Sequence, residues 1–272
     1  MPRHYNTARR IDFILKAFPK LRRKLEYIGR KYHEIQENWD YDCDYNGERW
    51  LVRTLAAAGK LESVFDVGAN HGDWTAMVLE ENPGAVVHCF EISPATFQKI
   101  ARRAEAEGWQ PPRAFLNAFG LSNENTETKI KYFPDGDSIS TLVEVMSAHK
   151  YELVGAQVMR GKDYCARQAI PGIDLLKLDV EGAEHLVLEG FEDLIQPATI
   201  PVVQFEYGRA CILTKYLLKD YYDFFTKRGY RIGKLFPSSV RFRDYQLEDE
   251  NFLGPNYIAA NPQLAGILGA VK

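Results

Sequence analysis

The chain has 272 residues with a formal net charge of −3, and 46% of its residues are hydrophobic. That composition can bury a sizeable core, and the sequence contains no internal repeat or low-complexity tract. No apolar run approaches the roughly 20 residues that span a bilayer. Residues 1–4 lead into a charged segment rather than a signal peptide, so we expect a cytoplasmic protein. The cysteines are too widely separated to indicate a CxxC metal site or a disulfide framework; they are Cys43, Cys89, Cys165 and Cys211.

Residues 1–34 form a basic arm on an acidic body. The arm holds ten Lys or Arg against three acids, a net charge of +7, so the rest of the chain carries −10. Apolar residues recur in the arm at helical spacing, namely Ile11, Ile14, Leu15, Phe18, Leu21, Leu25 and Ile28. Because Pro19 interrupts them, we expect a pair of short amphipathic helices. Such helices can lie on an anionic membrane, contact a polyanion, or pack on the domain or a second subunit.

Residues 39–47 alternate acidic and aromatic side chains and are typical of a connector. Their acids do not complete a calcium loop, because the glycine is misplaced and no glutamate ends the pattern. We therefore expect residues 1–49 to form a basic helical extension with its connector. Residues 50–272 should form one catalytic domain.

The segment 64–72, VFDVGANHG, carries an apolar strand into a glycine turn. Asp66 is followed by Gly68 and Gly72, and glycine lets a backbone adopt conformations closed to other residues and lie against a ligand. A dinucleotide-binding turn has glycine at its first, third and sixth positions, whereas Asn70 is the third residue here. The spacing Asp-x-Gly-x-x-x-Gly is instead typical of class I S-adenosylmethionine (SAM) methyltransferases.

A helix over 73–82, with Trp74 on its apolar face, leads to a second strand at 85–90. Glu91 at the tip of that strand is placed to accept hydrogen bonds from both ribose hydroxyls, or alternatively to cap the next helix. After a helix over 94–107, a third strand ends at Asn117, whose amide suits an adenine edge or a turn. The expected cofactor-binding residues are thus Asp66, Gly68, Asn70, Gly72, Trp74, Glu91 and Asn117.

Alternating residues at 128–133 predict an antiparallel hairpin strand, with a turn at 134–137. Downstream, a buried-type strand over 173–178 presents Asp179, and Glu181 follows two residues later. The next strand, 200–205, ends at Glu206. Because open α/β sheets bind ligands at the carboxyl ends of their strands, these acids should converge if the strands are neighbours.

The acids admit three interpretations. Asp179 and Glu206 could hold a hard divalent cation, most plausibly Mg²⁺, which would lower the pKa of an acceptor hydroxyl. Metal-dependent small-molecule O-methyltransferases of this fold usually have a further acid just after the second carboxylate, where this chain has Tyr207. A metal-free general base is the second interpretation, supplied by His185 or by a carboxylate of raised pKa. In the third, Glu181 caps a helix and Asp179 holds backbone amides.

Strands are also expected at 230–235 and 256–260, the latter antiparallel to its neighbours. The long loop between them carries Lys234, Arg241 and Arg243, which could face a phosphorylated or glycosylated acceptor or stand in solvent.

Four blocks occur in order along the chain: FDVGANHGDWT at 65–75, FE at 90–91, LLKLDVEGAEHLVLEG from 175 to 190, and VQFE at 203–206. Together they resemble the FkbM-type methyltransferases over roughly residues 50–262. The resemblance implies an α/β class I methyltransferase (Rossmann-like) fold, a mainly parallel seven-stranded sheet with an antiparallel last strand. It also implies SAM as cofactor and O-methylation of a carbohydrate, glycoconjugate or related metabolite. The hydroxyl-rich residues 138–141 match a segment of the family that borders the active site.

Two other functions stay open. The basic arm would suit a nucleic-acid methyltransferase, but the body is acidic and no Asn-Pro-Pro-Tyr-like motif follows the fourth strand. A non-catalytic SAM-binding module would bind SAM without turnover. We expect a hydroxylated small molecule or glycan as the acceptor, with Asp179, Glu181, Glu206 and His185 as catalytic candidates. A homo-oligomer is also compatible with the sequence.

Overall fold

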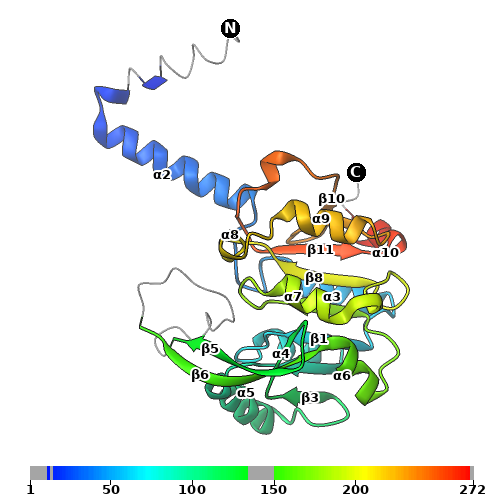
Figure 1. The fold of residues 1–272 in the computed structure, drawn as a ribbon. Helices are drawn as coiled ribbons and strands as arrows, with labels where there is room; N and C mark the ends of the chain where they lie inside the picture. Colours follow the sequence, from blue (N-terminus) through cyan, green and yellow to red (C-terminus); the bar gives the residue numbers. More distant parts are fainter. Residues whose placement is uncertain (1–10, 13–14, 134–149, 270–272) are drawn as a thin grey trace. The chain divides into compact units, whose positions relative to one another are not determined.

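The computed structural model describes residues 11–12, 15–133 and 150–269, and the chain forms two compact units, residues 1–39 and 40–272 (Figure 1). The first unit contains α2 (Pro19–Gln36), which begins at a proline because the missing N–H costs no hydrogen bond in the first turn. The interruption expected at Pro19 is present, but the helix that follows is 18 residues long rather than short. Among the described residues, no helix is both long and apolar enough to cross a membrane.

The boundary between the units falls earlier than the boundary expected after residue 49. Residues 40–47 belong to the second unit, and α3 (Glu48–Ala57) follows them. Leu51, Val52 and Leu55 of this helix are fully buried in the core. The segment expected to be a connector is therefore part of the larger unit.

The large sheet has the order β10-β9-β11-β8-β7-β1-β2-β3. Its strands are β1 (Ser63–Val67), β2 (Val86–Phe90), β3 (Ala114–Asn117), β7 (Leu175–Leu178), β8 (Val202–Glu206), β9 (Arg231–Phe236), β10 (Ser239–Phe242) and β11 (Asn256–Ala260). The pairs from β3 to β8 are parallel, and β11 runs antiparallel to β8 and β9. The predicted fold class is confirmed, with β11 as the antiparallel last strand. β10 adds an eighth strand, because part of the expected long loop pairs with β9.

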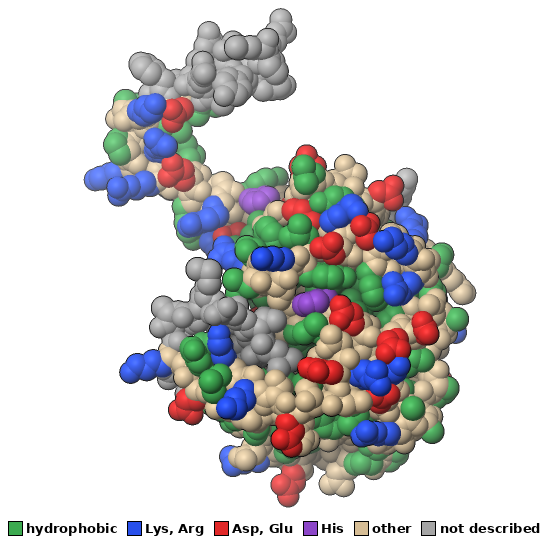
Figure 2. Space-filling view, viewed as in Figure 1, with side chains coloured by type: hydrophobic (Ala, Val, Ile, Leu, Met, Phe, Trp, Pro, Cys, Tyr) green, Lys and Arg blue, Asp and Glu red, His purple; other side chains and the backbone are tan. Residues whose placement is uncertain are grey.

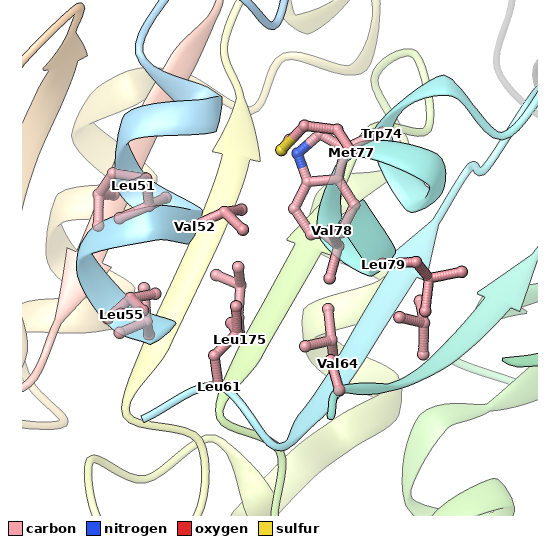
Figure 3. Close-up of a cluster of buried hydrophobic side chains, with 14 of the residues drawn as sticks. Leu51, Val52, Leu55, Leu61, Val64, Trp74, Met77, Val78, Leu79 and Leu175 are labelled. Atoms are coloured by element: carbon pink, nitrogen blue, oxygen red, sulfur yellow. The ribbon is translucent and has the colours of Figure 1, made fainter. Parts of the chain in front are cut away.

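Helices cover both faces of this sheet, as continuous apolar strands require. They are α4 (Asp73–Glu81), α5 (Pro94–Glu107), α6 (Gly161–Gln168), α7 (Glu184–Phe191), α8 (Ala210–Thr214), α9 (Leu218–Thr226) and α10 (Pro262–Leu268). Figure 3 shows one core cluster, in which Leu51 of α3 and Trp74 and Val78 of α4 lie over β1 and β7. Phe65 belongs to a second cluster on the other face of the sheet, because successive side chains of a strand point to opposite faces.

A smaller sheet, β4-β6-β5, joins β4 (Gly120–Ser122), β5 (Thr126–Tyr132) and β6 (Glu152–Arg160). β5 pairs antiparallel with β6, which confirms the hairpin strand expected at 128–133. The turn expected at 134–137 and the hydroxyl-rich residues 138–141 lie outside the described residues.

Candidate active site

The two glycines after β1 shape the loop at the carboxyl end of the sheet. Gly68 has φ +86°, and a Cβ there would overlap the carbonyl oxygen of Asp179. Gly72 has φ +79° and precedes α4, where a Cβ would press on the side chains of Trp109 and Ile100. Glycine is thus required at both positions by contacts within the protein. The close packing of the loop against the rest of the protein therefore accounts for both glycines.

Three acids meet beside this loop. Asp179 follows β7, Glu181 lies two residues further on, and Glu206 ends the neighbouring parallel strand β8. One carboxylate oxygen from each acid lies within 4.8 Å of the others. The acids line a cavity of about 540 Å³ whose other lining residues are Tyr41, Asn46, Glu48, Gly68, Asn70, Pro255 and Asn256. The structure thus brings together the three acids that the sequence singles out.

Two members of the acid cluster, which is defined as Asp179, Glu181 and Glu206, have pKa values above those of isolated carboxylates. Burial, and then the charges of Asp179 and Glu184, raise the pKa of Glu181 to about 8. Burial and the charges of the neighbouring acids raise the pKa of Glu206 well above its ordinary value. Since like charges in close contact disfavour joint ionisation, Glu181 and Glu206 keep their protons to higher pH than isolated glutamates do.

The turn that carries Glu181 is capped by Glu184. Its Oε1 accepts hydrogen bonds from the backbone N–H groups of Val180 (2.9 Å) and Gly182 (3.3 Å). The capping role considered for Glu181 therefore belongs to Glu184. Glu181 itself has φ +54°, a left-handed conformation that is costly for a residue with a side chain. Its side chain lines the cavity instead of capping the turn.

A buried cation, Lys177, lies under the cluster and was missed by the sequence reasoning. Its Nζ lies 3.0 Å from Asp179 Oδ2 and 3.5 Å from Asp66 Oδ1. Burial opposes the charge, but the carboxylates of Asp179, Asp66 and Glu48 outweigh it and raise the pKa of Lys177. The signal that could have revealed it is a lysine inside a buried apolar strand, because lysine is almost never buried without a partner.

Glu91 supports the glycine loop, whereas Asp66 is bound by side chains of α4 and β7. Asp66 is fully buried, accepts a 2.7 Å hydrogen bond from Thr75 Oγ1 and faces Lys177. Glu91 accepts hydrogen bonds from the backbone N–H groups of Asn70 (2.9 Å) and Ser93 (2.7 Å). Neither acid lines the described cavity. Glu91 thereby fixes the conformation of Asn70, which does line it.

Three further candidates lie elsewhere in the described structure. The side-chain N–H₂ group of Asn117 donates hydrogen bonds to the carbonyl of Cys89 (3.0 Å) and to two other acceptors nearby. These donors are therefore engaged within the protein. Trp74 is buried in the core on the inner face of α4. His185 stacks on Tyr216 with ring centroids 4.9 Å apart. It follows the inward-pointing Glu184 by one residue, which turns its side chain about 100° around the helix axis.

A polar wall lines the same cavity as the acid cluster and includes Asn46, Glu48 and Asn256. Glu48 accepts hydrogen bonds from Asn46 Nδ2 (2.8 Å) and from the side-chain amide of Gln204. Gln204 also donates to Asn256 Oδ1 (3.1 Å), while its own Oε1 is buried with no hydrogen-bond partner among the described residues. Sequence reasoning missed this wall because residues 40–47 resemble a connector.

The residue after Glu206 points away from the cluster. Tyr207 is fully buried, and its hydroxyl donates a 2.5 Å hydrogen bond to Glu250. The basic residues expected to face the acceptor are also engaged elsewhere: the guanidinium of Arg241 lies 3.6 Å from the centroid of the Phe236 ring, and Arg243 pairs with Asp249. The third carboxylate of the cluster is thus Glu181 instead of a residue at position 207.

Residues 66–232, more than half of the chain, match the methyltransferase FkbM domain. The chain belongs to the FkbM methyltransferase family. The match begins at Asp66 and includes every residue of the acid cluster and Lys177. The family assignment predicted from the four blocks is therefore confirmed. Residues Tyr41, Asn46 and Glu48 of the cavity lie before the matched segment.

Several curated proteins are similar to this FkbM family member. The 31-O-demethyl-FK506 methyltransferase FkbM of Streptomyces tacrolimicus is 30% identical over 52% of this chain and 63% of its own length. The hexuronic acid methyltransferase AglP of Haloferax volcanii is 24% identical over 64% of this chain and 68% of its own. The 2-O-methyltransferase NoeI of Sinorhizobium fredii is 26% identical over 48% of this chain and 58% of its own length. The first of these relatives is thus matched over less than two thirds of its length.

Among solved structures, a methyltransferase FkbM from Methylobacillus flagellatus KT is similar to this family member with a TM-score of 0.48 and 14% identity. The alignment covers 74% of this chain and 44% of that one.

Proposed function

We propose that this FkbM family member is a SAM-dependent O-methyltransferase whose acceptor is a carbohydrate or a related polyhydroxylated metabolite. The observation that carries the proposal is the acid cluster, which lines a cavity at the carboxyl ends of two adjacent strands. The polar wall of Asn46, Glu48 and Asn256 offers hydrogen-bonding groups to several hydroxyls of one acceptor. Relatives named for a hexuronic acid and for 2-O-methylation support this acceptor class.

The residues around the glycine loop fit SAM. Gly68 and Asn70 line the cavity, and Asn70 Oδ1 is a buried acceptor with no hydrogen-bond partner in the described part of the chain. Glu91 lies directly behind Asn70 and offers a carboxylate of raised pKa, because burial disfavours its charge. SAM supplies a sulfonium-activated methyl group when bound. Asn70 is thus the side chain that would contact its nucleoside, and Glu91 would support that contact by holding the Asn70 backbone.

The acid cluster would orient the acceptor hydroxyl and take its proton. A carboxylate with a pKa near the working pH is a more effective general base than one of ordinary acidity. Glu181 meets this condition, with its pKa raised to about 8 chiefly by burial. Lys177 holds Asp179 in place through a 3.0 Å ion pair. Positioning of the hydroxyl supplies much of the acceleration, because the two reactants are then held at a fixed approach.

A divalent cation is the alternative means of removing the hydroxyl proton. Asp179, Glu181 and Glu206 would hold it, since oxygen ligands suit Mg²⁺, and a bound cation lowers the pKa of a hydroxyl. In that case the cation would displace the protons that Glu181 and Glu206 otherwise hold. Turnover in the presence of a chelator distinguishes the two mechanisms. Turnover persists if a general base removes the hydroxyl proton, and it stops if a divalent cation is required.

The proposed function is tested by methyl transfer from labelled SAM to matched acceptors. The panel should contain uronic acids, neutral glycosides and a polyhydroxylated macrolide, with short DNA and RNA duplexes as competitors. We expect label in a methyl ether of a sugar or metabolite, identified by mass spectrometry of the product. Label in nucleic acid alone, or SAM binding without transfer to any hydroxyl, would refute the proposal.

Replacing Glu91 by alanine is expected to weaken SAM binding by roughly tenfold or more, because a buried charged hydrogen-bond acceptor is lost. The change also releases the backbone N–H of Asn70, which Glu91 holds at 2.9 Å. Calorimetric titration measures the affinity, and Glu105→Ala on the exposed side of α5 is the matched control. Equal affinities of the two variants would remove Glu91 from the cofactor site.

We expect kcat/KM to rise with pH around the pKa of Glu181, which burial and the charges of Asp179 and Glu184 raise from 4.5 to about 8. The base acts in its unprotonated form, so activity appears as the proton leaves. The stability of the fold changes in the opposite sense. Between pH 4.5 and about 8, Glu181 binds its proton more tightly in the folded protein than in the unfolded chain, so the contribution of Glu181 to stability falls as pH rises. Profiles of the wild type and Glu181→Gln check this, and superimposable profiles would contradict it.

A further inference from the structure

Helix α2 carries an apolar stripe that no described residue of its own unit buries. Phe18 at its N-cap is followed by Leu21, Leu25, Ile28, Tyr32 and Ile35, at alternating spacings of three and four residues. Residues so spaced share one face of a helix. All six are exposed, from 45% at Leu25 to 72% at Ile35, and α2 has no buried residue. Because most of the stability of a helix in a protein comes from packing of its amphipathic face, covering this face would stabilise α2.

Basic side chains flank the stripe. Helix α2 has six Lys or Arg against two Glu, a net charge of +4, and Figure 2 shows basic and hydrophobic side chains next to each other on it. At 100° per residue, Lys20, Lys24 and Lys31 follow one edge of the stripe. The two acids, Glu26 and Glu34, are engaged by Arg22 and Lys31 within the helix. The described ion pairs therefore leave Lys20 and Lys24 available to an external anion.

These charges argue against a second copy of the same helix as the occupant. In a parallel pair, the positions that flank the stripe would bring Lys24 to Gly29 and Lys31 to Gln36, without an ion pair. An antiparallel pair would bring Lys24 to Lys31, two like charges. Self-association would thus bury the apolar stripe without complementary charges. A partner with a negatively charged surface and an apolar interior would match both the flanking lysines and the apolar stripe of α2.

We propose that α2 binds the surface of an anionic lipid bilayer, with the apolar stripe among the acyl chains and the flanking lysines at the headgroups. A helix with these features lies in the plane of the interface rather than across it. Long basic side chains at the edge of an apolar face can reach the headgroups while their methylene groups stay buried. The attachment would place the catalytic unit near acceptors carried on lipids, and this consequence rests on the proposed function.

Co-sedimentation of the full chain with vesicles tests the proposal. We expect binding to phosphatidylcholine vesicles containing about 30% phosphatidylserine, and at least about tenfold weaker binding to phosphatidylcholine alone, because the lysines require anionic lipid. Raising the salt from about 0.05 M to about 0.5 M should weaken the binding, since screening shortens the reach of the charges. Equal binding to both kinds of vesicle, or binding unaffected by salt, would overturn the proposal.

Face-specific variants complete the test. The paired variant Leu25→Glu and Ile28→Glu should lower vesicle binding by about tenfold or more, because it places charge in the apolar stripe. Tyr27→Glu, on the other side of the helix and exposed, is the matched control and should retain most of the binding. All variants should keep wild-type SAM affinity, since α2 has no buried residue. Equal loss in both variants, or a concentration-dependent dimer abolished by the paired variant, would refute membrane binding by this face.

Discussion

Replacing Asp179 by asparagine is expected to lower turnover by about 100-fold or more while SAM affinity changes only a few-fold. The variant keeps the size of the side chain but removes a carboxylate that lies within 4.8 Å of Glu181 and Glu206. A neutral amide holds an acceptor hydroxyl less well and cannot take a proton from it. Glu206→Gln should act in the same sense. Single-turnover rates and calorimetric SAM titration separate the chemistry from cofactor binding.

Asp193→Asn is the control for a general loss of charge, because Asp193 is exposed away from the cavity. Wild-type rates in both Asp179→Asn and Glu206→Gln would refute the acid cluster as the reacting centre. If turnover persists in chelator and His185→Ala is impaired instead, the base is His185. That result would require the ring to leave Tyr216, on which it is stacked.

The sequence predicts the main elements well where their signals are local. Helix α5 spans Pro94–Glu107 as expected, because Ser93 caps its first turn by accepting from the Thr96 N–H and Gly108 ends it in a left-handed conformation. Strand β11 spans the expected residues because its apolar run ends at Asn261, the N-cap of α10. Such boundaries depend on short-range contacts that one sequence contains.

The acid cluster follows from topology rather than from any local signal. Asp179 and Glu206 lie 27 positions apart in the numbering, and only the parallel pairing of β7 with β8 brings them together. The parallel fold, once inferred, predicts which strand ends meet. It does not predict rotation about a helix axis, and the place of His185 on α7 was therefore not determined by the sequence.

Contacts between distant segments account for the features that were missed. Lys177 is paired with Asp66 across the sheet, and Glu48 meets Gln204, which lies more than 150 positions later. The short strand β10 depends on pairing with β9 more than on its own four residues. Side-chain pairing of this kind overrides local preference and becomes visible only in the folded structure.

Lys177→Met is expected to lower the free energy of unfolding by about 3–5 kcal/mol, because removing one partner leaves an uncompensated buried charge. Methionine has a similar length and fills the space, so the loss arises from charge rather than from a cavity. The charge left behind is the carboxylate of Asp66, which has 0% solvent exposure. Urea denaturation measures the change.

The destabilisation should depend on pH in a defined direction. Burial raises the pKa of Asp66, and in the wild type the charge of Lys177 opposes that effect. Without Lys177 the folded state holds the Asp66 proton still more tightly, so the stability of the variant falls further behind that of the wild type as pH rises above the raised pKa that Asp66 has in the wild type. A difference between variant and wild type that is constant from pH 5 to 8 would contradict this cause.

The double variant Lys177→Met with Asp66→Asn separates the lost ion pair from lost packing. Removing both charges together should recover a large part of the stability, because a neutral amide costs far less to bury than an unpaired carboxylate. Thr75 can still donate its hydrogen bond to the amide oxygen that replaces the carboxylate, since that donor is 2.7 Å from Asp66 Oδ2. Lys129→Met on the exposed side of β5 is the matched control and should leave the free energy of unfolding nearly unchanged. If the double variant is no more stable than Lys177→Met, the lysine supports the sheet through packing and its charge is not what holds Asp66.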